Sequence, residues 1–123
     1  MLTLTLTAQV YLGLTPTDMR KSFDSLAALV RDELKSDPFS GSLFVFFSRR
    51  KDRIKLLYWD TDGFMIWMKR LEQGTYQFPL AQVNSDASSL SISSRELNLI
   101  LSGIDLDSAK RRPRYQRPDP TAK

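Results

Sequence analysis

Two aspartates separated by a single residue are the first side chains that could do chemistry. Asp60 and Asp62 stand in the run Asp60-Thr61-Asp62-Gly63, and with Glu72 or Asp24 they form a candidate divalent-metal site for a metal-dependent nuclease. A tight hairpin turn explains the same residues better, because aspartate side chains accept hydrogen bonds from nearby backbone amides and glycine tolerates a positive φ. We therefore predict a turn here, with no metal ion and no cofactor.

The chain has 123 residues and contains neither cysteine nor histidine. Thiolate and imidazole metal sites are therefore excluded, as are cysteine nucleophiles and Ser-His-Asp catalysis. The sequence also has no glycine-rich loop of the kind that cradles nucleotide phosphates. We expect a protein that is not an enzyme.

Positive charge is concentrated in two short segments. The net charge is +4, but residues 110–123 alone hold six basic residues and one acidic residue, a net +5, so residues 1–109 sum to −1. Several separated cations suit a polyphosphate such as DNA, although solvated loops are often basic as well. The predicted nucleic-acid-binding residues are Arg49, Arg50, Lys51, Arg53 and Lys55 in the first segment and Lys110, Arg111, Arg112, Arg114 and Arg117 in the second.

One long amphipathic helix is predicted before the first basic segment. A strand is expected over residues 9–14, and Thr15-Pro16-Thr17-Asp18 carries the signals of a helix start, so the helix should run to about Lys35. Asp37-Pro38 then ends it. Its predicted buried stripe consists of Met19, Phe23, Leu26, Val30 and Leu34.

Three strands rich in aromatic and β-branched residues follow, over residues 43–47, 54–59 and 64–69. Their short connections predict hairpins, so the expected fold is α+β: an antiparallel β-meander of three to five strands packed against the long helix. Both faces of the meander are apolar, and the helix can cover only one. The second face must be covered by C-terminal segments, by a second copy of the chain or by a partner protein.

The C-terminal third is predicted to hold a short edge strand at residues 76–78, a loop at residues 84–89, and a short helix capped by Ser93 or Ser94 and ended by Gly103. We expect a single domain over residues 1–107 and a basic, flexible, disordered tail over residues 108–123. The sequence holds no apolar run of about 20 residues and its start lacks the positive region of a signal peptide. We therefore expect a cytoplasmic protein without a membrane segment.

Four segments taken together resemble the TnpB-type accessory protein, or second open reading frame, of the insertion-sequence-66 family. They are Pro16-Thr17-Asp18-Met19-Arg20-Lys21-Ser22-Phe23-Asp24-Ser25-Leu26, Asp37-Pro38-Phe39-Ser40-Gly41-Ser42-Leu43-Phe44-Val45-Phe46, Asp52-Arg53-Ile54-Lys55 with Trp59-Asp60-Thr61-Asp62-Gly63, and Lys69-Arg70-Leu71-Glu72-Gln73-Gly74. The resemblance implies a bacterial mobile element whose separate transposase cuts and joins DNA strands. It also implies that this chain is an accessory.

We therefore predict a non-catalytic transposition accessory protein that contacts DNA, in the form of transposon ends, through the basic hairpin and the tail. The alternative is a protein adapter that binds or stabilises the transposase, or another accessory protein, through an apolar face of the sheet. The apolar strands also leave a homo-oligomer open.

Overall fold

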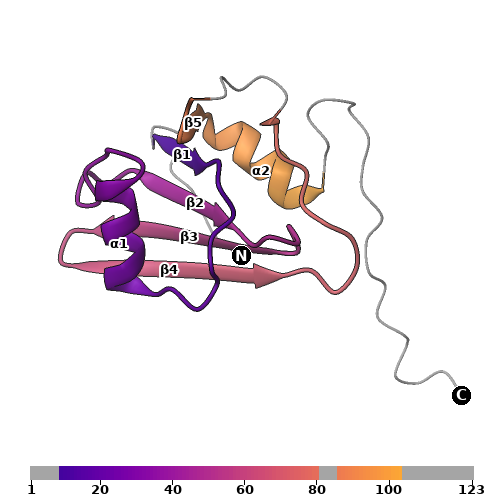
Figure 1. Cartoon of the computed structure of the whole chain (residues 1–123), viewed down its shortest axis with the longest axis horizontal. Coiled ribbons are helices and arrows are strands. Elements are labelled where there is room, and N and C mark those ends of the chain that lie inside the picture. The colour runs from indigo at the N-terminus through magenta and orange to yellow at the C-terminus, as the bar shows by residue number, and fades with distance from the viewer. Residues whose placement is uncertain (1–8, 81–85, 104–123) are drawn as a thin grey trace, which may run out of the picture.

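A five-stranded mixed sheet lies at the centre of the computed structural model, which describes residues 9–80 and 86–103 (Figure 1). The strands are β1 (Val10–Gly13), β2 (Leu43–Phe47), β3 (Arg53–Asp60), β4 (Gly63–Arg70) and β5 (Ser89–Ile92), in the spatial order β4-β3-β2-β1-β5. β1 runs parallel to β2, and the other neighbouring pairs are antiparallel. The prediction of an antiparallel meander was therefore wrong. The chain between β1 and β2 carries a helix, and such a crossover connects parallel neighbours.

The prediction of a long amphipathic helix was also wrong, because α1 (Phe23–Asp32) has only ten residues. Residues 15–21 instead form a loop. The Thr17 N–H donates to the carbonyl of Phe47 at 2.8 Å, and the Asp18 carboxylate accepts from the Arg20 N–H at 2.9 Å. These bonds hold the segment against the end of β2, so the helix starts later, where the Ser22 N–H donates to Ser25 Oγ at 2.9 Å.

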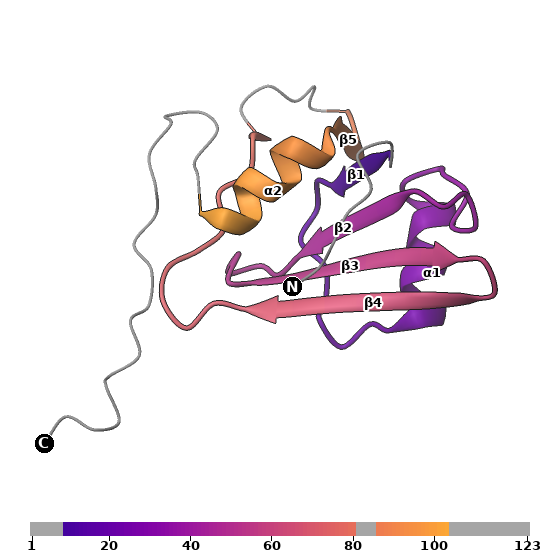
Figure 2. The ribbon, with the colours of Figure 1, turned by 180° about the vertical axis from the view of Figure 1, so that it is seen from behind.

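The two faces of the sheet carry separate apolar cores. On one face, α1 and Leu34 pack against β2 and β3, forming the buried cluster Leu26, Ala27, Val30, Leu34, Phe44, Phe46 and Leu57. On the other face, seen from behind in Figure 2, α2 (Ser94–Ser102) packs on the sheet. Of the predicted helical stripe, Leu26, Val30 and Leu34 are buried, whereas Phe23 is exposed.

The C-terminal part of the chain covers the second face, which answers the question that the sequence left open. Tyr76 and Phe78 are buried there together with Leu97 and Ile100 of α2. The prediction of an edge strand at residues 76–78 was wrong, because this segment forms no strand, and Tyr76 and Phe78 pack into the core. Its apolar side chains pack into the core, and the edge strands of the sheet are β4 and β5.

The predicted C-terminal helix is confirmed together with its caps. Ser93 Oγ accepts from the Glu96 N–H and the Ser93 N–H donates to the Glu96 carboxylate, each at 3.0 Å. Gly103 ends the helix with φ of +88°. The residues from Ser89 onward form β5 rather than the end of a loop, and residues 81–85 lie outside the described part of the chain.

The predicted hairpin turn between β3 and β4 is present, but its unusual backbone angle falls on a different residue. Thr61 has φ of +51°, and the Asp62 N–H donates to the Asp60 carbonyl, which makes a γ-turn centred on Thr61. Gly63 does not use a positive φ and begins β4 instead. The turn therefore places a β-branched residue where glycine would be relaxed.

The predicted domain boundary at residue 107 and the predicted tail lie outside the described residues, so both stay predictions. Within residues 9–80 and 86–103, neither helix is long and apolar enough to cross a membrane.

Candidate nucleic-acid interface

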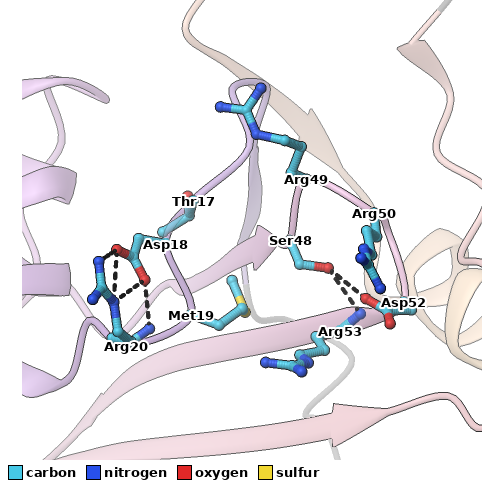
Figure 3. Close-up of a pocket in the computed structure, with 9 residues that line it drawn as sticks. All are labelled: Thr17, Asp18, Met19, Arg20, Ser48, Arg49, Arg50, Asp52 and Arg53. Atoms are coloured by element: carbon cyan, nitrogen blue, oxygen red, sulfur yellow. Dashed lines mark hydrogen bonds and ion pairs between the residues drawn. The ribbon is translucent and has the colours of Figure 1, made fainter.

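Two loops face each other at one end of the sheet and enclose a groove of about 550 Å³ that opens to solvent (Figure 3). One loop precedes α1, and the other is the hairpin between β2 and β3. The groove is lined by Thr17, Asp18, Met19, Arg20, Ser48, Arg49, Arg50, Asp52 and Arg53. The structure thus brings three of the predicted hairpin cations together with one that was not predicted, Arg20.

A buried serine fixes the shape of the hairpin. Ser48 Oγ donates to the Asp52 carboxylate at 3.0 Å and accepts from the Arg53 N–H at 3.1 Å, and the Ser48 carbonyl accepts from the Lys51 N–H at 2.8 Å. Lys51 completes the turn with φ of +60°. Asp52 is engaged by Ser48, and the arginines of the hairpin project in different directions around it (Figure 3).

The hairpin arginines have no intramolecular counter-charge among the described residues. Arg49 and Arg50 are exposed and Arg53 is half-buried, and none of the three forms an ion pair within that part of the chain. Arg53 also stands directly opposite Arg70 of β4 in the ladder. Like charges placed opposite each other on one face repel, so an anion bound here would relieve a local electrostatic cost.

Arg20 has a different role on the opposite wall of the groove. Its Nε and Nη2 donate to both oxygens of Asp18, with the Nη2 contact at 2.7 Å. These hydrogen bonds hold the pKa of Asp18 well below its usual range and raise the pKa of Arg20. Arg20 itself was missed because its neighbours in sequence were interpreted as the first turn of a helix.

Arg70, at the end of β4, is a further cation near this corner that was missed. It is the Cα partner of Arg53 in the β3–β4 register, whereas Lys69 is the partner of Ile54 and therefore lies on the opposite face of the sheet. Arg70 donates to Glu72 through an exposed ion pair of 3.0 Å. Only the ladder register could have revealed this neighbourhood, because seventeen positions separate Arg53 from Arg70.

Lys55 does not fit the predicted binding set. Its side chain is buried, and Nζ donates to the Lys21 carbonyl at 2.6 Å. It shares the α1 face of β3 with Arg53, since the two residues are two positions apart, but it is covered by the segment that leads into α1, whereas Arg53 lines the groove. We therefore leave Lys55 out of the proposed interface. The predicted tail residues Lys110, Arg111, Arg112, Arg114 and Arg117 lie outside the described residues.

The candidate metal ligands do not converge in the part of the chain that the structure describes, where no group of three acidic side chains comes together. Asp60 and Asp62 stand at the turn that begins β4, whereas Glu72 follows its far end. The eight residues of β4 separate them by about 26 Å at ~3.3 Å per residue. Both aspartates stand at the β3–β4 turn, as predicted, but the hydrogen bond that closes the turn runs between backbone atoms, from the Asp62 N–H to the Asp60 carbonyl.

Fold and site together define a small mixed-sheet domain with a cationic groove at one corner. The family of IS66 Orf2 like proteins matches residues 8–111, and the chain belongs to this family. Membership indicates an accessory role in transposition and confirms the resemblance noted in the sequence.

Two relatives come from Sinorhizobium fredii strain NGR234. The uncharacterized protein y4jC is 34% identical over 114 residues, which cover 93% of each chain. The uncharacterized protein y4hO is 37% identical over 97 residues, which cover 79% of this chain and 81% of the relative. No solved structure matches the chain.

Proposed function

We propose that this accessory protein binds DNA by placing the phosphate backbone against the groove arginines Arg49, Arg50 and Arg53. The observation that supports the proposal most strongly is their arrangement: three arginines on a hairpin shaped by Ser48, none of them paired with a carboxylate in the described part of the chain. Arginine suits this task because its planar guanidinium can donate two parallel hydrogen bonds to a phosphate.

A polymer is a better ligand for this groove than a small metabolite. Small-molecule pockets are usually concave and mostly apolar, and they bury most of their ligand, whereas this groove is open and its arginine side chains project from separate points around it (Figure 3). Separated cations can each contact a different phosphate and release several counterions on binding. The contacts proposed here go to the backbone, so they position the protein on DNA without reading its sequence.

Salt dependence tests the proposal on the full chain with a duplex that carries the ends of the element. The triple variant R49Q/R50Q/R53Q should weaken binding and should lower the slope of log affinity against log salt by about 2 to 3, since each lost phosphate contact contributes roughly 0.9. The matched control is R31Q/K35Q/R95Q, which removes the same charge from exposed sites outside the groove. Equal losses of DNA affinity in the two triple variants would show that net charge alone causes the effect, and would contradict a defined binding site.

The basic tail is proposed to add further phosphate contacts. Removing residues 108–123 deletes a net charge of +5, so the salt slope of the truncated chain should fall further than that of the hairpin variant. A chain that binds DNA equally well with and without these residues would exclude the tail from the interface.

The adapter alternative has lost the observation that first motivated it. It required a spare apolar face, and α2 with Tyr76 and Phe78 now covers that face. Co-purification with the transposase from nuclease-treated extract would support an adapter, and loss of the complex after nuclease treatment would favour the DNA-mediated interpretation.

A further inference from the structure

The outer edge of β4 has an unusual composition for an exposed strand edge. β4 is the last strand of the sheet, and no other described element lies beside its outer edge (Figures 1 and 2). Its five residues Phe64 to Met68 are all apolar, and neither a proline nor a charge interrupts them. Long apolar edges are templates for pairing with another strand, and proteins usually protect them. The opposite edge strand, β5, has only four residues, two of which are serine.

Large apolar side chains are exposed along the same edge. Met65 is 52% exposed and Met68 is 47% exposed, on opposite faces of the sheet. Phe39 is 56% exposed and packs against Phe64 and Trp59, with ring centroids 5.2 and 5.0 Å apart. The apolar surface therefore continues from β4 onto the α1 face. Such a surface on a domain whose two cores are already complete indicates a contact site.

We propose that β4 is a dimer interface, at which it pairs antiparallel with β4 of a second copy across a two-fold axis through Ile66, extending the sheet from five strands to ten. Backbone hydrogen bonds across the new ladder supply the pairing, and the exposed methionines supply the apolar contact.

The register follows from which face each side chain occupies. Residues opposite each other in an antiparallel pair share a face of the sheet. The two-fold axis must therefore set one residue opposite its own copy, and cannot set two sequence neighbours opposite each other. Phe64 and Ile66 belong to the α1 face, and Trp67 belongs to the α2 face. An axis at Ile66 sets Phe64 opposite Met68 of the partner subunit and Met65 opposite Trp67 of the partner subunit. An axis at Trp67 would instead set Met65 and Phe64 opposite Lys69 and Arg70 of the partner subunit.

Charge complementarity selects the same register. With the axis at Ile66, Asp62 stands opposite Arg70 of the partner subunit and Gly63 stands opposite Lys69 of the partner subunit, and the arrangement repeats on the other side of the axis. Lys69 is exposed and has no ion pair in the described part of the chain. Arg70 contacts Glu72 through an ion pair in which both side chains are more than half exposed. Such a pair is weak, so a change of partner costs little.

Sedimentation equilibrium over a concentration series tests the interface on the full chain. The wild type should dimerise, and Met65→Lys or Met68→Lys should raise the dimer dissociation constant at least about tenfold, since each change places two charges in an apolar contact. Both residues are about half exposed, so the monomer should remain folded by circular dichroism. The matched control is Ser91→Lys on β5, which should leave the constant unchanged.

Charge reversal and crosslinking test the register. Asp62→Lys should weaken the dimer roughly tenfold, and adding Arg70→Asp should restore most of the affinity, because the two changes recreate the pair in reversed polarity. The chain has no cysteine, so Ile66→Cys provides a single thiol that should crosslink through a short bis-maleimide, whereas Ser91→Cys should not. A wild type that stays monomeric at every concentration, or a dimer insensitive to both methionine changes, would overturn the proposal.

Discussion

Arg53 stands opposite a like charge, so its replacement should affect stability and DNA binding in opposite directions. Arg53 and Arg70 are Cα partners in the β3–β4 ladder, and their side chains share a face. The variant Arg53→Glu removes a repulsion and creates a cross-strand ion pair. Each effect contributes roughly 0.2–1 kcal/mol, so the free energy of unfolding of the variant should rise by about 0.5–2 kcal/mol. At about 4–8 °C per kcal/mol, its Tm should rise by several degrees.

Thermal unfolding and DNA titration on the same samples provide both readouts. Arg53→Glu should raise Tm and should weaken DNA binding, with a salt slope lower by about one. The stability gain should shrink in high salt and should vanish when Arg70→Gln is added, since the new pair then has no partner. Arg31→Glu is the control for net charge, because Arg31 lies near the C-terminal end of α1, outside the groove. A destabilised Arg53→Glu, or one that binds DNA as the wild type does, would refute the reasoning.

Three further variants test the fold and the loop. Leu97→Ala should cost roughly 2–5 kcal/mol in chemical denaturation, because Leu97 is fully buried on α2, while exposed Asn98→Ala should cost little. Thr61→Gly should stabilise by about 0.5–1 kcal/mol, since relief of a positive φ exceeds the entropy of glycine, and Thr61→Ala should show no such gain. Asp18→Asn should lose stability above about pH 4, and its difference from the wild type should shrink as pH falls further. The lowered pKa of Asp18 means that the unfolded chain, with the ordinary value of 3.8, takes up that proton first.

The strands and the C-terminal helix could be predicted because their signals are local. Residues 43–47 match the predicted strand, and β3 and β4 extend their predictions by only one or two residues. The Ser93 cap and Gly103 fixed the limits of α2. β5 was missed because Ser89–Ile92 alternates serine with only two apolar residues, and its pairing with β1 decides its conformation.

The helix start and the sheet order required information that lies far away in the sequence. Thr15 to Asp18 carry strong capping signals, but the bond from Thr17 to Phe47 overrides them. The parallel pairing of β1 with β2 was available in principle, since a strand, a helix and a strand in succession favour a crossover. Of the site, the arginine hairpin was predicted from composition. The burial of Lys55, the place of Arg20 in the groove and the place of Arg70 opposite Arg53 depend on packing and on strand register.

The position of β1 between β2 and β5 has a consequence for the nascent chain. β1 is made first and β5 is made about 80 residues later, yet the two are neighbours in the sheet. At a synthesis rate of about 5–20 residues per second, β1 is synthesised roughly 4–16 s before β5, the strand that pairs with its outer edge. A chain that ends before Ser89 would leave the outer edge of β1 unpaired and would be prone to aggregate. Only a chain that includes β5 completes the sheet on this side.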